Sequence, residues 1–189
     1  MKIVITGGAG FIGSHLVDAV AEKHEVVVLD NFEPQVHTSG RPEYLNENAR
    51  YLFGDVRDKA VLRSALEGAE VVFHEAAAVG VGQSMYQVEK YVEVNTMGTA
   101  KLLDVLVNEE HEVQKLIVAS SMSIYGEGAY ACDDCGMVYP TLRTEEQLKR
   151  GEWEMRCPHC GKIVKPIPTS EDKPLHPTSI YASTKRDQE

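Results

Sequence analysis

The sequence predicts an α/β fold, a doubly wound parallel sheet, with a small metal-binding module inserted near the C-terminal end. Three observations support this prediction. Short β-branched runs alternate with segments of helical periodicity through the first 121 residues, a pattern typical of right-handed βαβ units. A glycine-rich turn separates the first such run from the first helical segment. All four cysteines lie between positions 132 and 160, in two pairs.

The composition is that of an ordinary soluble protein and excludes several kinds of partner. The chain has 189 residues, 43% hydrophobic and 25% charged, which is enough to build a core. Its formal net charge is -10 with no basic run, which argues against sequence-independent binding to nucleic acid or to an anionic membrane. No apolar stretch approaches the ~20 residues that span a bilayer, and no export cleavage site follows the N-terminal apolar run. We therefore expect a cytoplasmic protein.

Five short runs of apolar or β-branched residues predict strands, at 2–6, 25–30, 49–55, 70–77 and 115–121. The second run, EVVVLD, is almost continuously apolar, as in a parallel strand that is buried on both faces. Helical spacing of apolar residues is found over 11–23, 58–68 and 83–109. In the middle one of these segments, Asp58 fits an N-cap and Gly68 follows the last turn.

The turn after the first strand has the composition of a phosphate-binding loop. Residues 6–13, TGGAGFIG, place Gly7, Gly10 and Gly13 between a strand and a helix. Glycine permits a positive φ and a close approach to a pyrophosphate, and the helix N-terminus offers free N–H groups to it. Asp30, at the end of the second strand, can bind ribose hydroxyls and repels a 2′-phosphate. The context predicts a Rossmann-type site for NAD rather than NADP; the alternative is a structural turn with a strand-end acid.

The stretch GDVRD follows the third strand and is a candidate adenine contact. Asp55 and Val56 stand where a side-chain acceptor and an apolar group could hold an adenine ring. The alternative is a helix-capping loop, a role that fits Asp58 better than Asp55.

A serine-bearing strand end and a Tyr–Lys pair predict a catalytic group. The fifth strand delivers Ser120, Ser121 and Ser123 at its carboxyl end, the edge over which ligands bind in open α/β sheets. Tyr181 and Lys185 are four positions apart and so share a helix face. An ammonium close to a phenol stabilises the phenolate and makes it a usable base at neutral pH. A solvated helix pair is the usual explanation of this spacing alone, but the nucleotide fold and the serines favour catalysis here.

Six segments resemble, in order, the extended short-chain dehydrogenases/reductases of the nucleotide-sugar epimerase/dehydratase group: TGGAGFIGSHL, VVVLDNF, GDVRD, VNTMGTAKLLD, SSMSIYG and YASTK. The resemblance implies bound NAD and a catalytic triad of Ser121, Tyr181 and Lys185, with Lys185 also holding the nicotinamide ribose. The residues to which it assigns cofactor contacts are Gly7, Gly10, Phe11, Ile12, Gly13, Asp30, Asn31, Asp55, Val56, Ala76, Ala77, Asn95, Tyr181 and Lys185.

The resemblance also narrows the reaction. Dehydratases and decarboxylases of the group resemble T-D-E-V-Y-G or T-S-E-V-Y-G, whereas Met122 and Ser123 follow Ser121 here, so 4,6-elimination lacks a proton donor. The S-x-[ST]-x-Y-G form is similar to 4-epimerases, in which Tyr181 would take the C4 hydroxyl proton while NAD takes the hydride and returns it to the other face. We expect a nucleotide-sugar 4-epimerase acting on dTDP-L-rhamnose or a UDP-hexose. The alternatives are a dehydratase or dehydrogenase of the group, and a non-catalytic NAD-binding or zinc-ribbon interaction module.

The cysteines form two C-x-x-C-G knuckles, CDDCG and CPHCG. In a reducing compartment, such clustering favours a metal over disulfides. Four thiolates make a closed tetrahedral zinc site with no open position, and therefore a structural one; the ligands would be Cys132, Cys135, Cys157 and Cys160. Disulfides or an iron centre are the alternatives. The insert resembles that of a bacterial branch with dTDP-L-rhamnose 4-epimerase-like members, and its place between Ser121 and Tyr181 fits a lid or an interface.

We expect three parts in the chain: a dinucleotide-binding core over 1–128, the four-cysteine zinc-binding insert over 129–168, and a return to the core over 169–189. Members of the resembled family continue well past the Tyr–Lys helix into a domain that grips the nucleotide sugar. The resemblance therefore implies a C-terminally truncated chain that binds NAD weakly and epimerises poorly. For the full-length protein it implies a homodimer, with 83–109 as the candidate interface.

Overall fold

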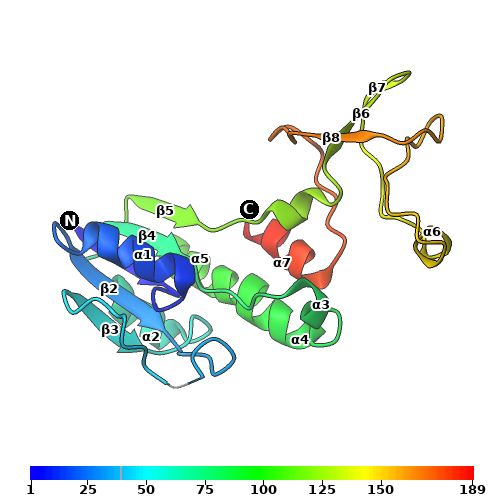
Figure 1. Ribbon diagram of the computed structural model, residues 1–189. Coiled ribbons are helices and arrows are strands. Elements are labelled where there is room, and N and C mark those ends of the chain that lie inside the picture. The colour runs from blue at the N-terminus through cyan, green and yellow to red at the C-terminus, as the bar shows by residue number, and fades with distance from the viewer. Residues whose placement is uncertain (39) are drawn as a thin grey trace. The chain divides into compact units, whose positions relative to one another are not determined.

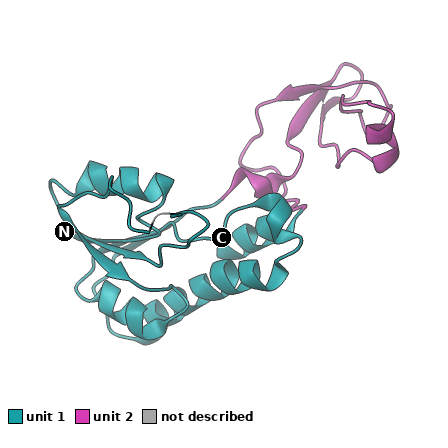
Figure 2. Ribbon diagram, turned by 60° about the horizontal axis from the view of Figure 1, so that its bottom comes forward, with its two compact units in different colours: residues 1–120, 179–189 teal, residues 121–178 magenta. Residues whose placement is uncertain are grey.

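A computed structural model describes residues 1–38 and 40–189. The chain forms two compact units, residues 1–120 with 179–189 and residues 121–178 (Figure 2). It leaves the first unit after Ser120 and returns to it at Ser179. The second unit contains the segment 129–168 in which the cysteines lie, and the expected domain boundaries stay a prediction. None of the helices in the described residues combines the length and the apolar character that a membrane crossing requires.

The first unit is built on a five-stranded sheet in the order β3-β2-β1-β4-β5 (Figure 1). Its strands are β1 (Lys2–Thr6), β2 (Glu25–Asp30), β3 (Ala49–Phe53), β4 (Val71–His74) and β5 (Lys115–Val118). All four neighbouring pairs are parallel, which confirms the predicted doubly wound sheet. The order reverses between β1 and β4, and open α/β sheets bind their ligands at such a switch point.

Two apolar layers hold the sheet to its helices, because successive side chains of a strand point to opposite faces. On one face, Ile3 and Ile5 of β1 pack with Val17 of α1 (Phe11–Val20). On the other, Val4 lies in a cluster with residues of α2 (Lys59–Leu66) and α5 (Gly98–Asn108). Full burial of one such aliphatic side chain stabilises the fold by about 1.5–3 kcal/mol. Val26, Val27, Val28 and Leu29 of β2 are all buried, as the continuous apolar run predicted.

The helical region after β4 differs from the single helix predicted over 83–109. It consists of α3 (Val81–Ser84), α4 (Val88–Tyr91), a π-helical turn (Val92–Met97) and α5. Apolar spacing does not reveal one wider turn, because a single extra residue shifts the pattern only slightly. The predicted strands at 70–77 and 115–121 also end early, at His74 and Val118, because the chain then turns into loops.

Short elements make up the second unit. Its antiparallel sheet has the order β7-β6-β8, from β6 (Ala129–Cys132), β7 (Gly136–Val138) and β8 (Lys165–Ile167). A 3₁₀ helix (Met122–Tyr125) and α6 (Glu145–Lys149) accompany it. Its core has five buried members, of which two are cysteines: Cys132, Val138, Met155, Cys157 and Val164. So small a core rarely holds a fold together without a disulfide or a metal.

Candidate functional site

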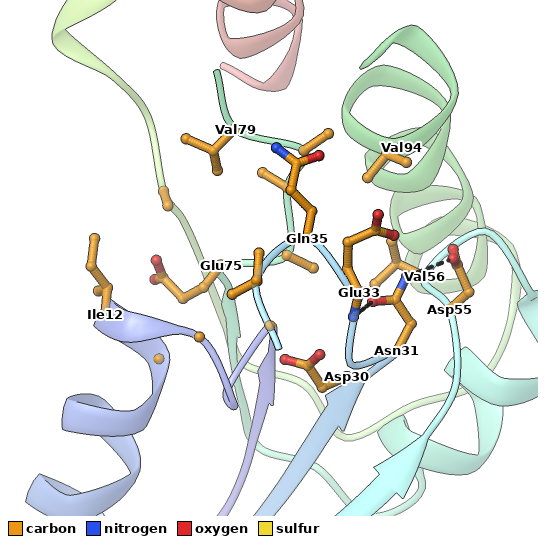
Figure 3. A pocket seen from close by; sticks show the side chains of 18 of the residues that line it. Ile12, Asp30, Asn31, Glu33, Gln35, Asp55, Val56, Glu75, Val79 and Val94 are labelled. Carbon is orange, nitrogen blue, oxygen red and sulfur yellow. Dashed lines mark hydrogen bonds between the residues drawn. The ribbon is translucent and has the colours of Figure 1, made fainter. Parts of the chain in front are cut away.

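A cavity of about 430 Å³ opens in the first unit, over the carboxyl ends of the five parallel strands (Figure 3). Its wall is formed by the loops that follow these strands, by the start of α1, by α4 with the π-helical turn, and by α7 (Ile180–Gln188). Of the predicted cofactor contacts all but Asn95 line it, namely Gly7, Gly10, Phe11, Ile12, Gly13, Asp30, Asn31, Asp55, Val56, Ala76, Ala77, Tyr181 and Lys185. The fold thus brings Lys185 into the same cavity as Gly7, which lies 178 positions earlier in the sequence.

In the glycine turn, close backbone contacts leave no room for a side chain at Gly7 or Gly13. Gly7 has φ +70°, and a Cβ there would lie 2.6 Å from the amide nitrogen of Ala76. A Cβ at Gly13 would lie 2.4 Å from the carbonyl oxygen of Gly7. Gly10 is the N-cap of α1, and among the described residues no side chain caps the helix and none in its first turn is acidic. The first N–H groups of α1 therefore remain available to an anion.

Asp30 ties the glycine turn to the loop after β2. One carboxylate oxygen accepts the N–H of Ala9 at 3.0 Å, and the other accepts the N–H of Phe32 at 2.8 Å. Phe32 itself has φ +49°, a left-handed conformation. Each carboxylate oxygen can accept a second hydrogen bond. Asp30 can therefore shape the turn and still receive ribose hydroxyls, as the sequence predicted.

The carboxylate of Asp55 is already engaged. One oxygen accepts the backbone N–H and the Nε–H of Arg57, both at 2.9 Å. The other accepts Nη2 of Arg57 at 2.8 Å and Nδ2 of Asn31 at 3.1 Å. The hydrogen bond from Arg57 is the main cause that lowers the pKa of Asp55 to about 2. An adenine amine would compete with these four bonds, so the predicted adenine contact of Asp55 stays a prediction.

Asn95 is the one predicted cofactor contact that does not line the cavity, and its predicted role stays a prediction. It sits in the π-helical turn and is fully buried. Its side chain accepts the N–H of Ala78 at 2.7 Å, and donates to the carbonyl of Ala78 at 3.1 Å and to Oγ1 of Thr184 at 3.0 Å. Asn95 therefore joins the loop after β4 to α7 and supports the cavity from outside.

Tyr181 is fixed by the way that α7 begins. The side chain of Ser179 caps the helix by accepting the N–H of Ala182 at 3.0 Å. The hydroxyl of Ser84 accepts the N–H of Tyr181 at 3.0 Å and donates to the carbonyl of Val81 at 2.6 Å. These two hydrogen bonds give Ser84 a capping role at the start of α7.

Lys185 is buried on the wall of the same cavity and has Glu75 as its acidic neighbour. Burial lowers the pKa of Lys185, and the charge of Glu75 partly offsets this. Burial likewise raises the pKa of Glu75, and the ammonium of Lys185 opposes that change. No sequence pattern singles out Glu75, since one acid after a buried strand is common in any fold.

Ser121, the third predicted catalytic residue, belongs to the second unit. Its hydroxyl accepts the N–H of Ser123 at 3.2 Å and caps the 3₁₀ helix. Its predicted place beside Tyr181 stays a prediction. Ser120, in the first unit, lines the cavity, and its hydroxyl donates to the carboxylate of Glu189.

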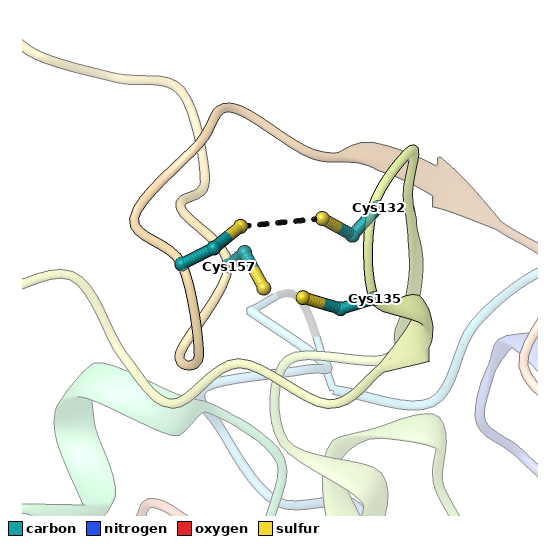
Figure 4. A group of neighbouring side chains, drawn as sticks. Cys132, Cys135 and Cys157 are labelled. Atoms are coloured by element: carbon teal, nitrogen blue, oxygen red, sulfur yellow. Dashed lines mark hydrogen bonds between the residues drawn. The ribbon is translucent and has the colours of Figure 1, made fainter.

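In the second unit the predicted metal ligands come together as one cluster. The sulfur atoms of Cys132, Cys135, Cys157 and Cys160 all lie within 4.8 Å of one another (Figure 4). None of the four is in a disulfide. Tetrahedral zinc with Zn–S bonds of ~2.3 Å places its sulfur ligands ~3.8 Å apart. The cluster therefore has the donor set and the size of a four-thiolate metal site.

A family model confirms the resemblance seen in the sequence. The model of the NAD-dependent epimerase/dehydratase family matches residues 3–145. The chain belongs to this family.

Individual members of the family agree with this assignment. The dTDP-L-rhamnose 4-epimerase of Burkholderia thailandensis is 36% identical over 192 residues, which cover 100% of this chain and 52% of that protein. The UDP-N-acetylglucosamine 4-epimerase of Methanobrevibacter ruminantium M1, in complex with UDP-N-acetylmuramic acid, has a TM-score of 0.71 at 29% identity, covering 100% of this chain and 48% of that one. A mutant UDP-glucuronic acid 4-epimerase of Bacillus cereus, in complex with NAD and UDP-4-deoxy-4-fluoro-glucuronic acid, has a TM-score of 0.70 at 28% identity, with coverages of 100% and 50%. The chain spans about half the length of these relatives.

This family member also contains a buried polar chain that sequence reasoning missed. His74 is paired through Nδ1 with Oγ1 of Thr6 at 2.7 Å and through Nε2 with Oγ1 of Thr99 at 2.9 Å. The hydroxyl of Thr99 donates its one proton to the carbonyl of Asn95 at 2.7 Å. It can therefore only accept in its bond with His74, so Nε2 of His74 carries a proton and donates it to Thr99. Gln188 of α7 donates to the same hydroxyl at 2.6 Å. These hydrogen bonds link β1, β4, α5 and α7 and make His74 a structural residue.

Proposed function

We propose that the chain is the dinucleotide-binding part of an NAD-dependent nucleotide-sugar 4-epimerase. One observation carries this proposal: Tyr181 and Lys185 line the same cavity as the glycine turn and Asp30. A base and its ammonium partner at a dinucleotide groove are what oxidation of a sugar hydroxyl requires. The relatives named above are 4-epimerases of three different nucleotide sugars, which supports the same reaction class here.

The wall residues fit NAD. The uncapped N-terminus of α1 would hold the pyrophosphate, Asp30 the adenosine ribose, and Lys185 the nicotinamide ribose. The carboxylate of Asp30 would meet a 2′-phosphate with like charge, so NAD is favoured over NADP. When bound, NAD supplies the acceptor and the later donor of the hydride at C4 of the sugar.

The remaining chemistry falls to three side chains. The phenol of Tyr181 would take the proton of the C4 hydroxyl and later return it. The ammonium of Lys185 would stabilise the phenolate in a buried setting, where an opposite charge has a stronger effect than in water. The hydroxyl of Ser121 would bind the same sugar oxygen. Met122 and Ser123 offer no acid beyond this point, which disfavours a dehydratase.

The sugar is proposed from the full-length match. The alignment with the Burkholderia dTDP-L-rhamnose 4-epimerase covers the whole chain, including the cysteine segment, at 36% identity, whereas the UDP-glucose 4-epimerase of Corynebacterium glutamicum, which covers 98% of the chain, is 29% identical. We therefore place dTDP-L-rhamnose before a UDP-hexose.

The four cysteines would bind one structural zinc ion within an inserted zinc-ribbon-like module at 129–168. The distances among the four sulfur atoms support this, and four thiolates leave no position for water. Reduced thiols also suit the cytoplasmic location expected from the sequence. A homodimer through 83–109 is supported by exposed apolar side chains there, notably Met85, Tyr86 and Met97.

The proposed function is tested by the fate of deuterium at C4. dTDP-L-rhamnose and UDP-glucose labelled at C4 would be incubated with this chain, and with any longer gene product that contains it, in unlabelled water. A 4-epimerase returns the label to the product and releases no NADH. Net NADH formation, or loss of water from the sugar, would contradict epimerisation. NAD binding to the chain, measured by calorimetry, tests the cofactor site separately.

A further inference from the structure

Among the acids and lysines of the cavity wall, two groups lack a partner in the described residues. The wall carries four acids and two lysines: Asp30, Glu33, Asp55, Glu75, Lys90 and Lys185. Four of them are engaged, because Asp30 accepts backbone N–H groups, Glu33 pairs with Lys90 at 3.0 Å, and Asp55 pairs with Arg57. In contrast, the side chains of Glu75 and Lys185 make no hydrogen bond or ion pair with any residue that the structure describes.

The backbone holds Glu75 at the switch point of the sheet. Its N–H donates to the carbonyl of Thr6 at 3.0 Å, which continues the pairing of β4 with β1. A Cβ atom added at Gly7 would lie 2.9 Å from the carbonyl carbon of Glu75, so the two backbone segments are in close contact. From this fixed position the side chain projects among the residues that line the cavity (Figure 3). The carboxylate of Glu75 therefore faces the cavity and makes no hydrogen bond to the described residues that would stabilise the fold.

The charge of Glu75 acts at the Lys185 end of the cavity. Lys185 lowers the pKa of Glu75 and Glu75 raises the pKa of Lys185, so each group favours the charged form of the other and opposes the effect of burial. The other acids of the wall belong to the end of β2 and to the loops after β2 and β3, where the adenosine half of the cofactor is proposed to lie. Glu75 is thus the acid that accompanies Tyr181 and Lys185.

We propose that Glu75 tunes the bound dinucleotide, favouring oxidised over reduced nicotinamide through the negative charge that it adds at the Lys185 end of the cavity. This rests on the proposed binding of NAD. The oxidised nicotinamide ring is a cation and the reduced ring is neutral, so Lys185 alone favours the reduced form. The carboxylate of Glu75 offsets that effect. An enzyme whose reaction begins by oxidising its substrate needs the oxidised cofactor in its resting state.

The test compares the affinities for NAD⁺ and NADH by calorimetry in the unmodified chain and in Glu75→Gln. The ratio of the two affinities is expected to move toward NADH by roughly tenfold, the effect of one charge acting over several ångströms in a partly buried site. Glu75→Leu serves as a second neutral variant should one of the two fail to fold. Glu33→Gln removes the same charge from the loop after β2 and is expected to leave the ratio within about twofold, because both cofactor forms share the adenosine half.

The outcomes separate this inference from the proposed function. An unchanged ratio in both neutral variants, or equal weakening of both forms, overturns the tuning role and leaves NAD binding intact. An equal shift in Glu33→Gln also overturns it, because the effect would then come from net charge alone. If the unmodified chain binds neither NAD⁺ nor NADH, the proposed function fails and this inference fails with it.

Discussion

The hydroxyl of Ser84 accepts a 3.0 Å hydrogen bond from the backbone N–H of Tyr181, across 97 positions of sequence. Ser84 is completely buried, and it also donates to the carbonyl of Val81. The bond satisfies one of the N–H groups that every helix leaves free at its start. It also fixes the first turn of α7, from which the phenol of Tyr181 enters the cavity.

Replacing Ser84 by Ala should destabilise the fold and misplace Tyr181. A buried N–H left without a partner costs about 1–3 kcal/mol, so the free energy of unfolding in urea should fall by about that amount. If the protein is an active epimerase, turnover should fall more than substrate affinity. Ser64→Ala, at an exposed position of α2, is the matched control and should change neither quantity. Equal stabilities of the two variants would mean that the bond contributes nothing.

Tyr181→Phe removes the proposed base while keeping the ring. The ring packs edge to face on Tyr91, with centroids 6.3 Å apart and planes at 88°, and this contact does not need the hydroxyl. Stability and NAD affinity should therefore stay close to those of the unmodified protein, whereas epimerisation should drop by about 10²–10⁴-fold. Tyr86→Phe, at an exposed position, should have no effect on either. Full activity in Tyr181→Phe would remove the catalytic role.

His74 should make stability depend on pH. Burial is the main cause that lowers its pKa from 6.5 to about 4, and Lys185 adds to it. Between these two values the unfolded chain binds a proton that the folded chain does not. Stability should therefore be complete above about pH 6.5 and fall by up to ~1.4 kcal/mol per pH unit as the pH drops toward 4.

Because carboxylates titrate in the same range, the contribution of His74 is read as a difference between variants. His74→Asn should be less stable at pH 7 and should lose part of the slope between pH 6.5 and 4. His15→Asn, on the exposed face of α1, should keep the slope. Identical slopes in the unmodified protein and in His74→Asn would contradict the assignment of a neutral, buried imidazole.

Each Cys→Ser substitution in the cluster should abolish stoichiometric zinc binding, since a three-thiolate site is open and weaker. The purified chain should contain one zinc ion per molecule by elemental analysis. Because two of the ligands are also core residues of the second unit, removing the metal with a chelator should expose that unit to proteolysis while β1–β5 stay protected. His159→Ala is the control: His159 is not part of the four-sulfur cluster, and its loss should leave the zinc content unchanged. A metal-free chain with four unreacted thiols and full protease resistance would contradict the zinc site.

Much of the first unit was predictable because its signals are local. The apolar run of β2 is typical of a strand buried on both faces, and Gly7 and Gly13 stand where the backbone leaves no room for a Cβ. Asp58 was predicted as the N-cap of α2, and its side chain accepts the N–H of Ala60. These features depend on residues that are adjacent in the sequence.

What could not be predicted depends on partners that are distant in sequence. The polar chain through His74 joins residues 68 and 25 positions away, and no spacing rule connects them. Asn95, in the π-helical turn, hydrogen-bonds to Ala78 and Thr184, which are 17 and 89 positions away. The hydrogen bond from Asn31 to Asp55 likewise forms only once the loops after β2 and β3 meet.

A crystal structure of the chain grown with NAD tests the central claim most directly. The account predicts density for the pyrophosphate at the N-terminus of α1, for the adenosine ribose at Asp30, and for the nicotinamide ring beside Tyr181 and Lys185. An empty cavity at saturating NAD would contradict it. So would a dinucleotide whose nicotinamide lies away from these two side chains.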